Sequence, residues 1–391
     1  MTFFEELKWR GLVKDISSPD LEEKLNNESL TFYWGTDPTA DSLHLGHYSS
    51  LVTAKRLMLH GHKPILLVGG ATGLIGDPRP TAEREIISKE TVEKNIEGLK
   101  RQVTRLLDNK AEVVNNYDWT KDVTFLDFLR DIGKYINVNY MLNKDIISRR
   151  LESGITYAEF SYTLLQGFDF LHLFKNKNCT LQAAGSDQWG NITTGIELIR
   201  KIEGTEAYGF TMPLILDKTG KKFGKSEGNA LWLDKEKTSP YLIYQYLLNS
   251  DDTKVIEYLK VFTFLNKEEI DALEEKVKTE PEKREAQKTL AYEVVKDLHG
   301  VEEAEKAKKT SEEVFTKGYS SEGMPSETIE YKDNMNLMDI LVMTKITTSK
   351  SEARRLIIGN GISVNNEKEL NPERIFAKEE INDLIISKGK K

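Results

Sequence analysis

The chain has 391 residues, of which 39% are hydrophobic and 30% charged, and its formal net charge at pH 7 is −8. This length exceeds what one compact core usually holds, so we expect two or three domains. The negative charge argues against a protein that coats nucleic acid over its whole surface. The absence of any run of 18 apolar residues argues against a membrane span and a membrane partner.

The cysteine content and the N-terminal residues bear on the compartment. Cys179 is the single cysteine, so it has no partner for an internal disulfide. The opening residues, MTFFEELKWRG, lack the basic and then apolar pattern of a signal peptide. We therefore expect a reduced, cytoplasmic compartment.

Strands and helices are predicted to alternate over the first half of the chain. The apolar, β-branched and aromatic runs LTFYWG (30–35), PILLVGG (64–70), AEVVNN (111–116) and CTLQAAG (179–185) predict strands. Helices are predicted between and after them, at about 45–60, 91–107, within 124–174, and at about 188–202. This alternation predicts an α/β fold: a Rossmann-like doubly wound parallel sheet with right-handed crossovers.

The sequence changes character after about Ser226. Residues 238–317 contain no convincing strand and many Glu/Lys pairs at helical spacing. The stretch YSSEGMPSETIEYKDN (319–334) is rich in serine, glycine and charge, which is typical of a linker. A helix pair, a Gly-Asn-Gly turn and a short strand follow. We therefore expect an α/β domain at 1–226 with a helical insertion at about 120–160, an all-helical domain at 227–318, a linker at 319–334 and a small C-terminal α+β domain at 335–391.

Two histidines lie where the first predicted strand meets the first predicted helix. In PTADSLHLGH (38–47), His44 and His47 share one face of the first helical turn. Ligands bind at this edge of an open parallel sheet, and a helix N-terminus attracts anions. Gly46 has no side chain to block a phosphate or nucleobase. Taken alone, the pattern also fits half of a metal site or two surface histidines.

A second stretch, KKFGKSEG (221–228), carries Lys222 and Lys225 before Ser226. A basic loop of this kind is suited to close over a polyphosphate, where its charges matter most as charge grows in the transition state. On its own, such a loop is more often a solvated turn.

Together the two stretches resemble the HIGH and KMSKS signatures of class I aminoacyl-tRNA synthetases, in the same order. Five further stretches are similar to bacterial tyrosyl-tRNA synthetases: TFYWGTDPTADSLHLGH, VGGATGLIGDP, NNYDW, FSYTLLQGFDF and GSDQWGNI. The resemblance covers most of residues 1–320 and returns in the tail. It implies a tyrosine–tRNA ligase that joins L-tyrosine and ATP into tyrosyl-adenylate and pyrophosphate, then transfers the tyrosyl group to the 3′-terminal ribose of tRNA(Tyr). Mg²⁺ is expected to be carried by the ATP phosphates, with no metal site formed by the protein.

The resemblance also implies roles for individual residues. The catalytic set that grips the phosphates would be His44, His47, Lys222, Lys225 and Ser226. ATP would be bound by Asp37, Gly46, Asp187 and Lys225. Tyrosine would be bound by Tyr33 and Asp169 at its phenol, by Asp77, Tyr162 and Gln166 at its ammonium, and by Gln188 at its carboxylate.

The spacing of the tyrosine-binding candidates is consistent with a pocket. Tyr162, Gln166 and Asp169 stand at i, i+4 and i+7 and so share one helix face. This periodicity also fits a polar outer face, but the apolar neighbours favour a pocket with a few fixed polar groups. An ammonium needs acceptors and negative charge, and a phenol needs partners that phenylalanine would leave unsatisfied.

Some assignments are weaker. Thr72 and Asn116 fit the site and fit turn capping equally well. Relatives often carry a lysine in the stretch that reads DPRPTAER (77–84) here. Arg79 or Arg84 is the candidate to take over the pyrophosphate contact of that lysine.

The tail resembles a small RNA-binding domain that bacterial tyrosyl enzymes share with a small-subunit ribosomal protein. Lys350, Arg354 and Arg355 are therefore expected to contact RNA phosphates, with a solvated basic face as the alternative. The resemblance also implies a homodimer, which we expect to form through the apolar helical stretch at 125–143.

Three other functions remain to be weighed. A tryptophanyl-type synthetase shares the signatures, but Tyr33 with Asp169 suits a phenol better than an indole. A simpler nucleotidylyltransferase would not need the tail. A catalytically inactive RNA-binding protein would not need the intact histidine and lysine motifs.

Overall fold

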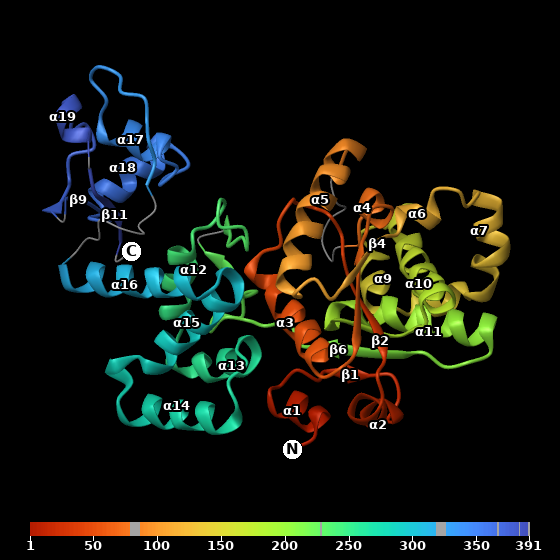
Figure 1. Cartoon of the computed structure of the whole chain (residues 1–391). Helices are drawn as coiled ribbons and strands as arrows, with labels where there is room; N and C mark the ends of the chain where they lie inside the picture. The colour runs from red at the N-terminus through yellow and green to blue at the C-terminus, as the bar shows by residue number, and fades with distance from the viewer. Residues whose placement is uncertain (79–86, 227–228, 318–325, 366, 383, 390–391) are drawn as a thin grey trace. The chain divides into compact units, whose positions relative to one another are not determined.

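The computed structural model describes residues 1–78, 87–226, 229–317, 326–365, 367–382 and 384–389 (Figure 1). Two compact units divide the chain: residues 1–238 with 250–290, and residues 239–249 with 291–391. Within the described residues, no helix is both long and apolar enough to cross a membrane.

The first unit is built on a six-stranded sheet in the order β1–β6–β5–β2–β3–β4. Strands β2 to β6 run parallel, and the short β1 pairs antiparallel with β6 at one edge. The strands are β1 (Asp15–Ile16), β2 (Thr31–Thr36), β3 (Lys63–Val68), β4 (Glu112–Asn115), β5 (Cys179–Gly185) and β6 (Tyr208–Met212). The chain order reverses between β2 and β5, which makes a switch point where ligands bind in such sheets.

Helices cover the sheet in the manner of a doubly wound fold (Figure 1). They are α1 (Phe3–Trp9), α2 (Asp20–Asn27), α3 (Leu45–Leu59), α4 (Thr72–Ile75), α5 (Lys89–Leu106), α6 (Tyr117–Thr120), α7 (Phe125–Asp131), α8 (Val138–Leu142), α9 (Asp145–Arg150), α10 (Tyr157–Lys177) and α11 (Trp189–Glu203). The Rossmann-like sheet predicted from the sequence is confirmed. Strand β1 at one edge of the sheet and its neighbour β6 were not predicted, because the two residues of β1 and the five residues of β6, which include Gly209, show no usable hydrophobic periodicity.

Helix α10 shows how local sequence sets the ends of an element. Thr156 caps its start by accepting a hydrogen bond from the Glu159 N–H, and Asn178 ends it in the left-handed conformation. Its 21 residues run along the sheet from Tyr157 to Lys177. The helix can therefore present several side chains to the switch point.

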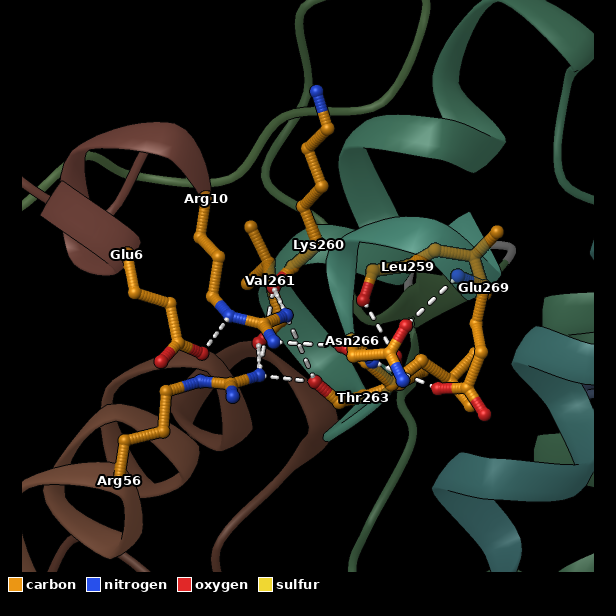
Figure 2. A network of polar contacts seen from close by, with 10 residues as sticks. Glu6, Arg10, Arg56, Leu259, Lys260, Val261, Thr263, Asn266 and Glu269 are labelled. Carbon is orange, nitrogen blue, oxygen red and sulfur yellow. Dashed lines mark hydrogen bonds and ion pairs between the residues drawn. The ribbon is translucent and has the colours of Figure 1, made fainter. Parts of the chain in front are cut away.

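Within the first unit, two buried arginines hold helix α13 (Asp252–Phe262): Arg10 at the end of α1 and Arg56 on α3. Arg10 Nη1 donates to the carbonyl of Lys260 at 2.9 Å, and Arg56 Nη2 donates to the carbonyls of Val261, at 3.2 Å, and Thr263 (Figure 2). These carbonyls lie at a helix C-terminus, where they lack helical partners and where cations are favoured. This attachment explains why α13 belongs with the sheet.

The helical segment expected at 227–318 is accordingly shared between the two units. The first unit also contains β7 (Lys225–Ser226), β8 (Asn229–Ala230), α14 (Lys267–Thr279) and the first residues of α15 (Glu285–His299). The second contains α12 (Pro240–Leu248), the rest of α15 and α16 (Val301–Lys317). Within the linker expected at 319–334, residues 319–325 lie outside the described residues.

The C-terminal part of the second unit has a core of its own. Leu337, Leu341, Ile357 and Phe376 are buried in it. It comprises α17 (Leu337–Met343), α18 (Lys350–Ile358), β9 (Ile362–Val364), β10 (Glu367–Lys368), α19 (Lys378–Ile381) and β11 (Ile386–Lys388). The strands form an antiparallel sheet in the order β10–β9–β11, and the α+β pattern expected for this segment is what the structure has.

Candidate active site

Two histidines stack at the N-terminus of α3, beside the carboxyl end of β2. His44 is the N-cap residue. Its ring Nδ1 accepts from the backbone N–H of Gly46 at 3.0 Å, and its backbone N–H donates to the ring Nδ1 of His47 at 3.3 Å. The ring centroids are 3.8 Å apart. Because Nδ1 of each ring accepts a hydrogen bond, the ring proton lies on Nε2 in both. Each ring therefore carries its N–H at Nε2.

The charge state of His47 follows from its surroundings. Burial, the neighbouring His44 and the charge of Lys222 lower the pKa of His47 to about 3. The ring is therefore neutral at physiological pH and acts as a hydrogen-bond donor without carrying a charge.

The loop that carries Lys222 lies directly against this helix tip. Gly224 has a φ of +86°, and a Cβ on it would lie 2.5 Å from the nitrogen of Gly46. A Cβ on Gly46 would lie 3.1 Å from the carbonyl oxygen of Phe223. The Leu231 N–H donates to the carbonyl of Gly224 at 3.0 Å and holds the loop from its other side. Only glycine allows the two backbones to come this close.

A buried carboxylate, that of Asp169, lies on α10. Asp169 accepts from Asn116 Nδ2 and from Trp119 Nε1, each at 2.9 Å. Burial raises the pKa of Asp169 to about 7, against the lowering effect of these two bonds. The buried hydroxyl of Tyr33, on β2, has no hydrogen-bond partner among the described residues. Burial and the charge of Asp169 raise the pKa of Tyr33 well above its usual value.

Asp37, at the end of β2, joins the polar groups of α10 to those of α4. Its Oδ1 accepts from Thr72 Oγ1 at 2.8 Å and its Oδ2 from the Tyr162 hydroxyl at 2.9 Å. Asn116 Nδ2 donates to Thr72 Oγ1 at 3.0 Å and so links this pair to Asp169. The sequence predicts Asp37 at the ATP end of the crevice, whereas these bonds place its carboxylate among the candidates for tyrosine binding.

A third polar cluster surrounds Asn191 in the first turn of α11. Asn191 Nδ2 donates to Gln166 Oε1 and to Gln188 Oε1, each at 3.0 Å, and to Asp77 Oδ1 at 3.3 Å. Gln188 Nε2 donates to Asp77 Oδ2 at 2.8 Å, and Thr163 Oγ1 donates to Asn191 Oδ1 at 2.8 Å. One buried amide thus fixes three of the residues that the sequence singles out.

The remaining candidates for ATP and pyrophosphate contacts are described only in part by the structure. Asp187 is exposed and folds back on Gly185, where an added Cβ would lie 2.7 Å from Asp187 Oδ1. The backbone of Lys225 and Ser226 forms β7, but their side chains lie outside the described part of the chain, as do Arg79 and Arg84 entirely. Across the described residues, no group of three or more His, Cys, Asp or Glu side chains is arranged to hold a metal ion.

In the C-terminal part of the chain, two of the three predicted RNA contacts are engaged in ion pairs. Lys350 Nζ lies 2.6 Å from Asp339 Oδ1, and Arg354 pairs with Glu373. Arg355 is exposed, and its guanidinium has no ion pair or hydrogen bond among the described residues. Exposed ion pairs are weak, so RNA phosphates can displace them.

Sequence reasoning missed two residues that organise the site. Asn191 follows Gln188 by three positions, and Trp119 follows Asn116 by three positions. In each case the second residue lies one helical turn later and supports the same pocket. That i, i+3 spacing at a helix start is the signal available in the sequence.

Comparison with known proteins adds independent evidence. The family model described as tRNA synthetases class I (W and Y) matches residues 25–316, and the tyrosine–tRNA ligase SYY-like C-terminal domain matches residues 316–391. Tyrosine–tRNA ligase 1 of Bacillus subtilis (strain 168) is 48% identical over 384 residues, which cover 93% of this chain and 91% of that protein. Tyrosine–tRNA ligase of Bacillus pumilus (strain SAFR-032) is 48% identical over 409 residues, with 99% and 97% covered.

The chain belongs to the tyrosyl-tRNA synthetase family. It is thus a class I aminoacyl-tRNA ligase, a tyrosine–tRNA ligase, and the family implies tyrosine, ATP and tRNA as its substrates. A truncated mitochondrial tyrosyl-tRNA synthetase from Coccidioides posadasii is 32% identical with a TM-score of 0.70, over 79% of this chain and 91% of that one. A tryptophanyl-tRNA synthetase from Encephalitozoon cuniculi, at 15% identity and a TM-score of 0.58 over 78% and 87%, shows the shared fold alone.

The low pKa of His47 predicts how the stability of this synthetase depends on pH. The folded state holds His47 neutral down to about pH 3, whereas the ring binds a proton near 6.5 when unfolded. The unfolded state therefore gains protons first, and stability falls as pH drops from 6.5 towards 3. Between pH 7 and pH 5, the free energy of unfolding should fall by about 2 kcal/mol less in His47→Gln than in the wild-type protein, as measured by urea unfolding. An equal fall in the wild type and the variant would contradict a low pKa for His47.

Proposed function

We propose that the crevice between the carboxyl ends of β2 and β5 binds tyrosine and ATP and joins them into tyrosyl-adenylate. The tyrosyl group would then pass to the 3′-terminal ribose of tRNA(Tyr). The observation that carries this proposal is a buried Tyr33 hydroxyl that has no hydrogen-bond partner among the described residues and lies near enough to the Asp169 carboxylate to feel its charge. A buried polar group without a partner is costly, and a substrate that supplies the partner recovers that cost.

The phenol of tyrosine fits this pair. Its hydroxyl would donate to Asp169 and accept from Tyr33, which uses both of its hydrogen-bonding capacities. The two bonds from Asn116 and Trp119 already orient the carboxylate. Phenylalanine would leave the Tyr33 hydroxyl without a partner and would offer Asp169 no third donor, which supports discrimination between the two amino acids.

The ammonium and carboxylate of the substrate fit the cluster around Asn191. Asp77, Tyr162 and Gln166 offer a carboxylate, a hydroxyl and an amide oxygen to the ammonium, and Asp37 adds negative charge beside Tyr162. Gln188 would place the substrate carboxylate, because its amide is oriented by the same network.

ATP would lie between the helix tip and the basic loop. His44 and His47 offer neutral Nε2–H donors, and Lys222 brings positive charge to the same edge. Gly46 leaves room for the nucleotide, and Lys225, Ser226 and Asp187 complete the proposed site. Mg²⁺ would accompany ATP on its phosphate oxygens, as this ion usually does.

The chemistry would need no nucleophile from the protein. The substrate carboxylate attacks the α-phosphorus in line, the bond to the β-phosphate oxygen breaks, and pyrophosphate leaves. The protein positions the two reactants and stabilises the charge that grows on the phosphates. A cytoplasmic location is part of the proposal, because charged tRNA is consumed by ribosomes there.

Tyrosine specificity is tested by ATP–pyrophosphate exchange with each of the twenty amino acids. Exchange should occur with tyrosine and be far slower with the other nineteen. Tyr33→Phe should lower the tyrosine-over-phenylalanine ratio of kcat/KM by about tenfold, the value of one lost hydrogen bond. Equal exchange with tryptophan, or an unchanged ratio in the variant, would overturn the pocket assignment.

We also propose a homodimer formed through the helical insertion. Phe125, Leu126 and Val138 are 66%, 75% and 59% exposed, so α7 and α8 present a group of large apolar side chains. Such a patch is unusual on a monomer and typical of an interface.

Leu126→Asp should convert the dimer into a monomer at micromolar concentration, because a charge would be buried at the interface. Leu59→Asp is the matched control, since Leu59 is 56% exposed at the end of α3. Sedimentation velocity distinguishes the outcomes. A wild-type monomer, or a Leu126→Asp dimer, would contradict the proposal.

The tail is proposed to bind tRNA through α18. Arg355→Ala should weaken tRNA binding about threefold to tenfold and reduce the slope of log K against log salt by about 1. Arg354→Ala, the matched control, should have a smaller effect because Arg354 is paired with Glu373. Filter binding across a salt series measures both. An unchanged slope in Arg355→Ala would contradict the proposal that α18 binds tRNA. The rate of pyrophosphate exchange should stay at the wild-type value in either variant.

A further inference from the structure

Aromatic side chains from three segments meet beneath the loop that carries Lys222. The Phe223 ring lies 4.7 Å from Tyr258 and 4.7 Å from Phe262, both on α13. Phe262 in turn stacks on Tyr48 of α3, with centroids 5.8 Å apart and planes at 7°. These four residues, called the aromatic cluster below, are all buried.

The two ends of the cluster adjoin the proposed ATP-binding groups. Tyr48 directly follows His47 in α3, and Phe223 directly follows Lys222 in the loop. Phe262 is stacked against both Tyr48 and Phe223. The buried Phe262 ring therefore contacts both the residue that follows His47 and the residue that follows Lys222.

Phe262 is itself held in a fixed place. It is the last residue of α13, and the carbonyls on either side of it, Val261 and Thr263, accept from Arg56 (Figure 2). Arg56 lies on α3, two turns after Tyr48. Helix α13 is thus attached to α3 at two points, by stacked rings and by a buried guanidinium, which resists both sliding and rotation.

Backbone bonds hold the loop at two further positions. The Phe223 N–H donates to the carbonyl of Ile215 at 3.0 Å, and the carbonyl of Gly224 accepts from the Leu231 N–H at 3.0 Å. These bonds fix the strand-like parts of the loop. Among the described residues, the loop makes its aromatic contacts with α13 through Phe223, which meets Tyr258 and Phe262.

We infer that Phe262 is a positioning residue for adenylate formation. It holds Phe223 and Tyr48 so that Lys222 and His47 face the same phosphates. The inference rests on the proposed ATP site and adds a residue outside it. Displacement of a reacting group by about 1 Å can cost as much as a hundredfold in rate, so a support of this kind has a measurable effect.

The test is the rate of tyrosyl-adenylate formation at saturating tyrosine and ATP, measured by rapid quench. Phe262→Leu should slow this step by roughly tenfold to a hundredfold and leave the Kd for tyrosine within about twofold. Phe4→Leu is the matched control: Phe4 is equally buried, lies in α1 and takes no part in the cluster. Thermal unfolding of both variants shows whether each is folded.

A double-mutant cycle separates positioning from general loss of structure. If Phe262 acts through Lys222, Phe262→Leu should have little further effect in a Lys222→Ala background. A residue that only stabilises the fold would give additive losses. If Phe262→Leu does not fold, Phe223→Leu tests the same contact, because it removes the other ring of the stacked pair. It should slow adenylate formation similarly.

The outcomes distinguish this inference from the proposed function. A wild-type protein that exchanges pyrophosphate with tyrosine, together with a Phe262→Leu variant as fast as Phe4→Leu, overturns the inference alone. Additive losses in the cycle, or a weakened tyrosine Kd, also overturn it. A wild-type protein without exchange overturns the proposed function instead.

Discussion

The site depends on the close approach of two backbones, at Gly46 on the tip of α3 and at Gly224 in the basic loop. An added Cβ on Gly224 would lie 2.5 Å from the Gly46 nitrogen. This contact brings Lys222 near enough for its charge to lower the pKa of His47. In the proposed function, the helix terminus with its neutral donors and the cationic loop together bind the phosphates of ATP.

The side of the crevice that is proposed to bind the amino acid contains buried and half-buried polar groups, and nearly all of them have hydrogen-bond partners. Asp37, Asp77 and Asp169 each accept two hydrogen bonds from neighbouring side chains. The exception among these groups is the Tyr33 hydroxyl. Such a network fixes the shape of a pocket before the substrate arrives, because moving one member leaves others unpaired. Pre-organisation of this kind reduces the conformational entropy that is lost when the substrate binds.

Much of this arrangement was predictable from the sequence. Strands β2, β3, β4 and β5 stood out as apolar runs, and the fold class followed from their alternation with helices. The histidine motif and the lysine loop indicated the reaction class through their joint resemblance to the signatures of class I aminoacyl-tRNA synthetases, because each motif alone also fits other roles. The elements that sequence reasoning missed are those without local periodicity, such as β6, and those defined by distant partners. The attachment of α13 through Arg10 and Arg56 spans about 200 residues or more, and no local pattern reveals it.

The central claim, that the loop and the helix tip act as one site, is tested most directly by the tyrosyl-adenylate formation rate of Gly224→Ala. Gly220→Ala is the matched control, because Gly220 also has a positive φ, of +80°, but has nothing within 4 Å of an added Cβ. The account predicts a large loss in Gly224→Ala with tyrosine binding retained, and a small loss at most in Gly220→Ala. Equal rates in the two variants would contradict it.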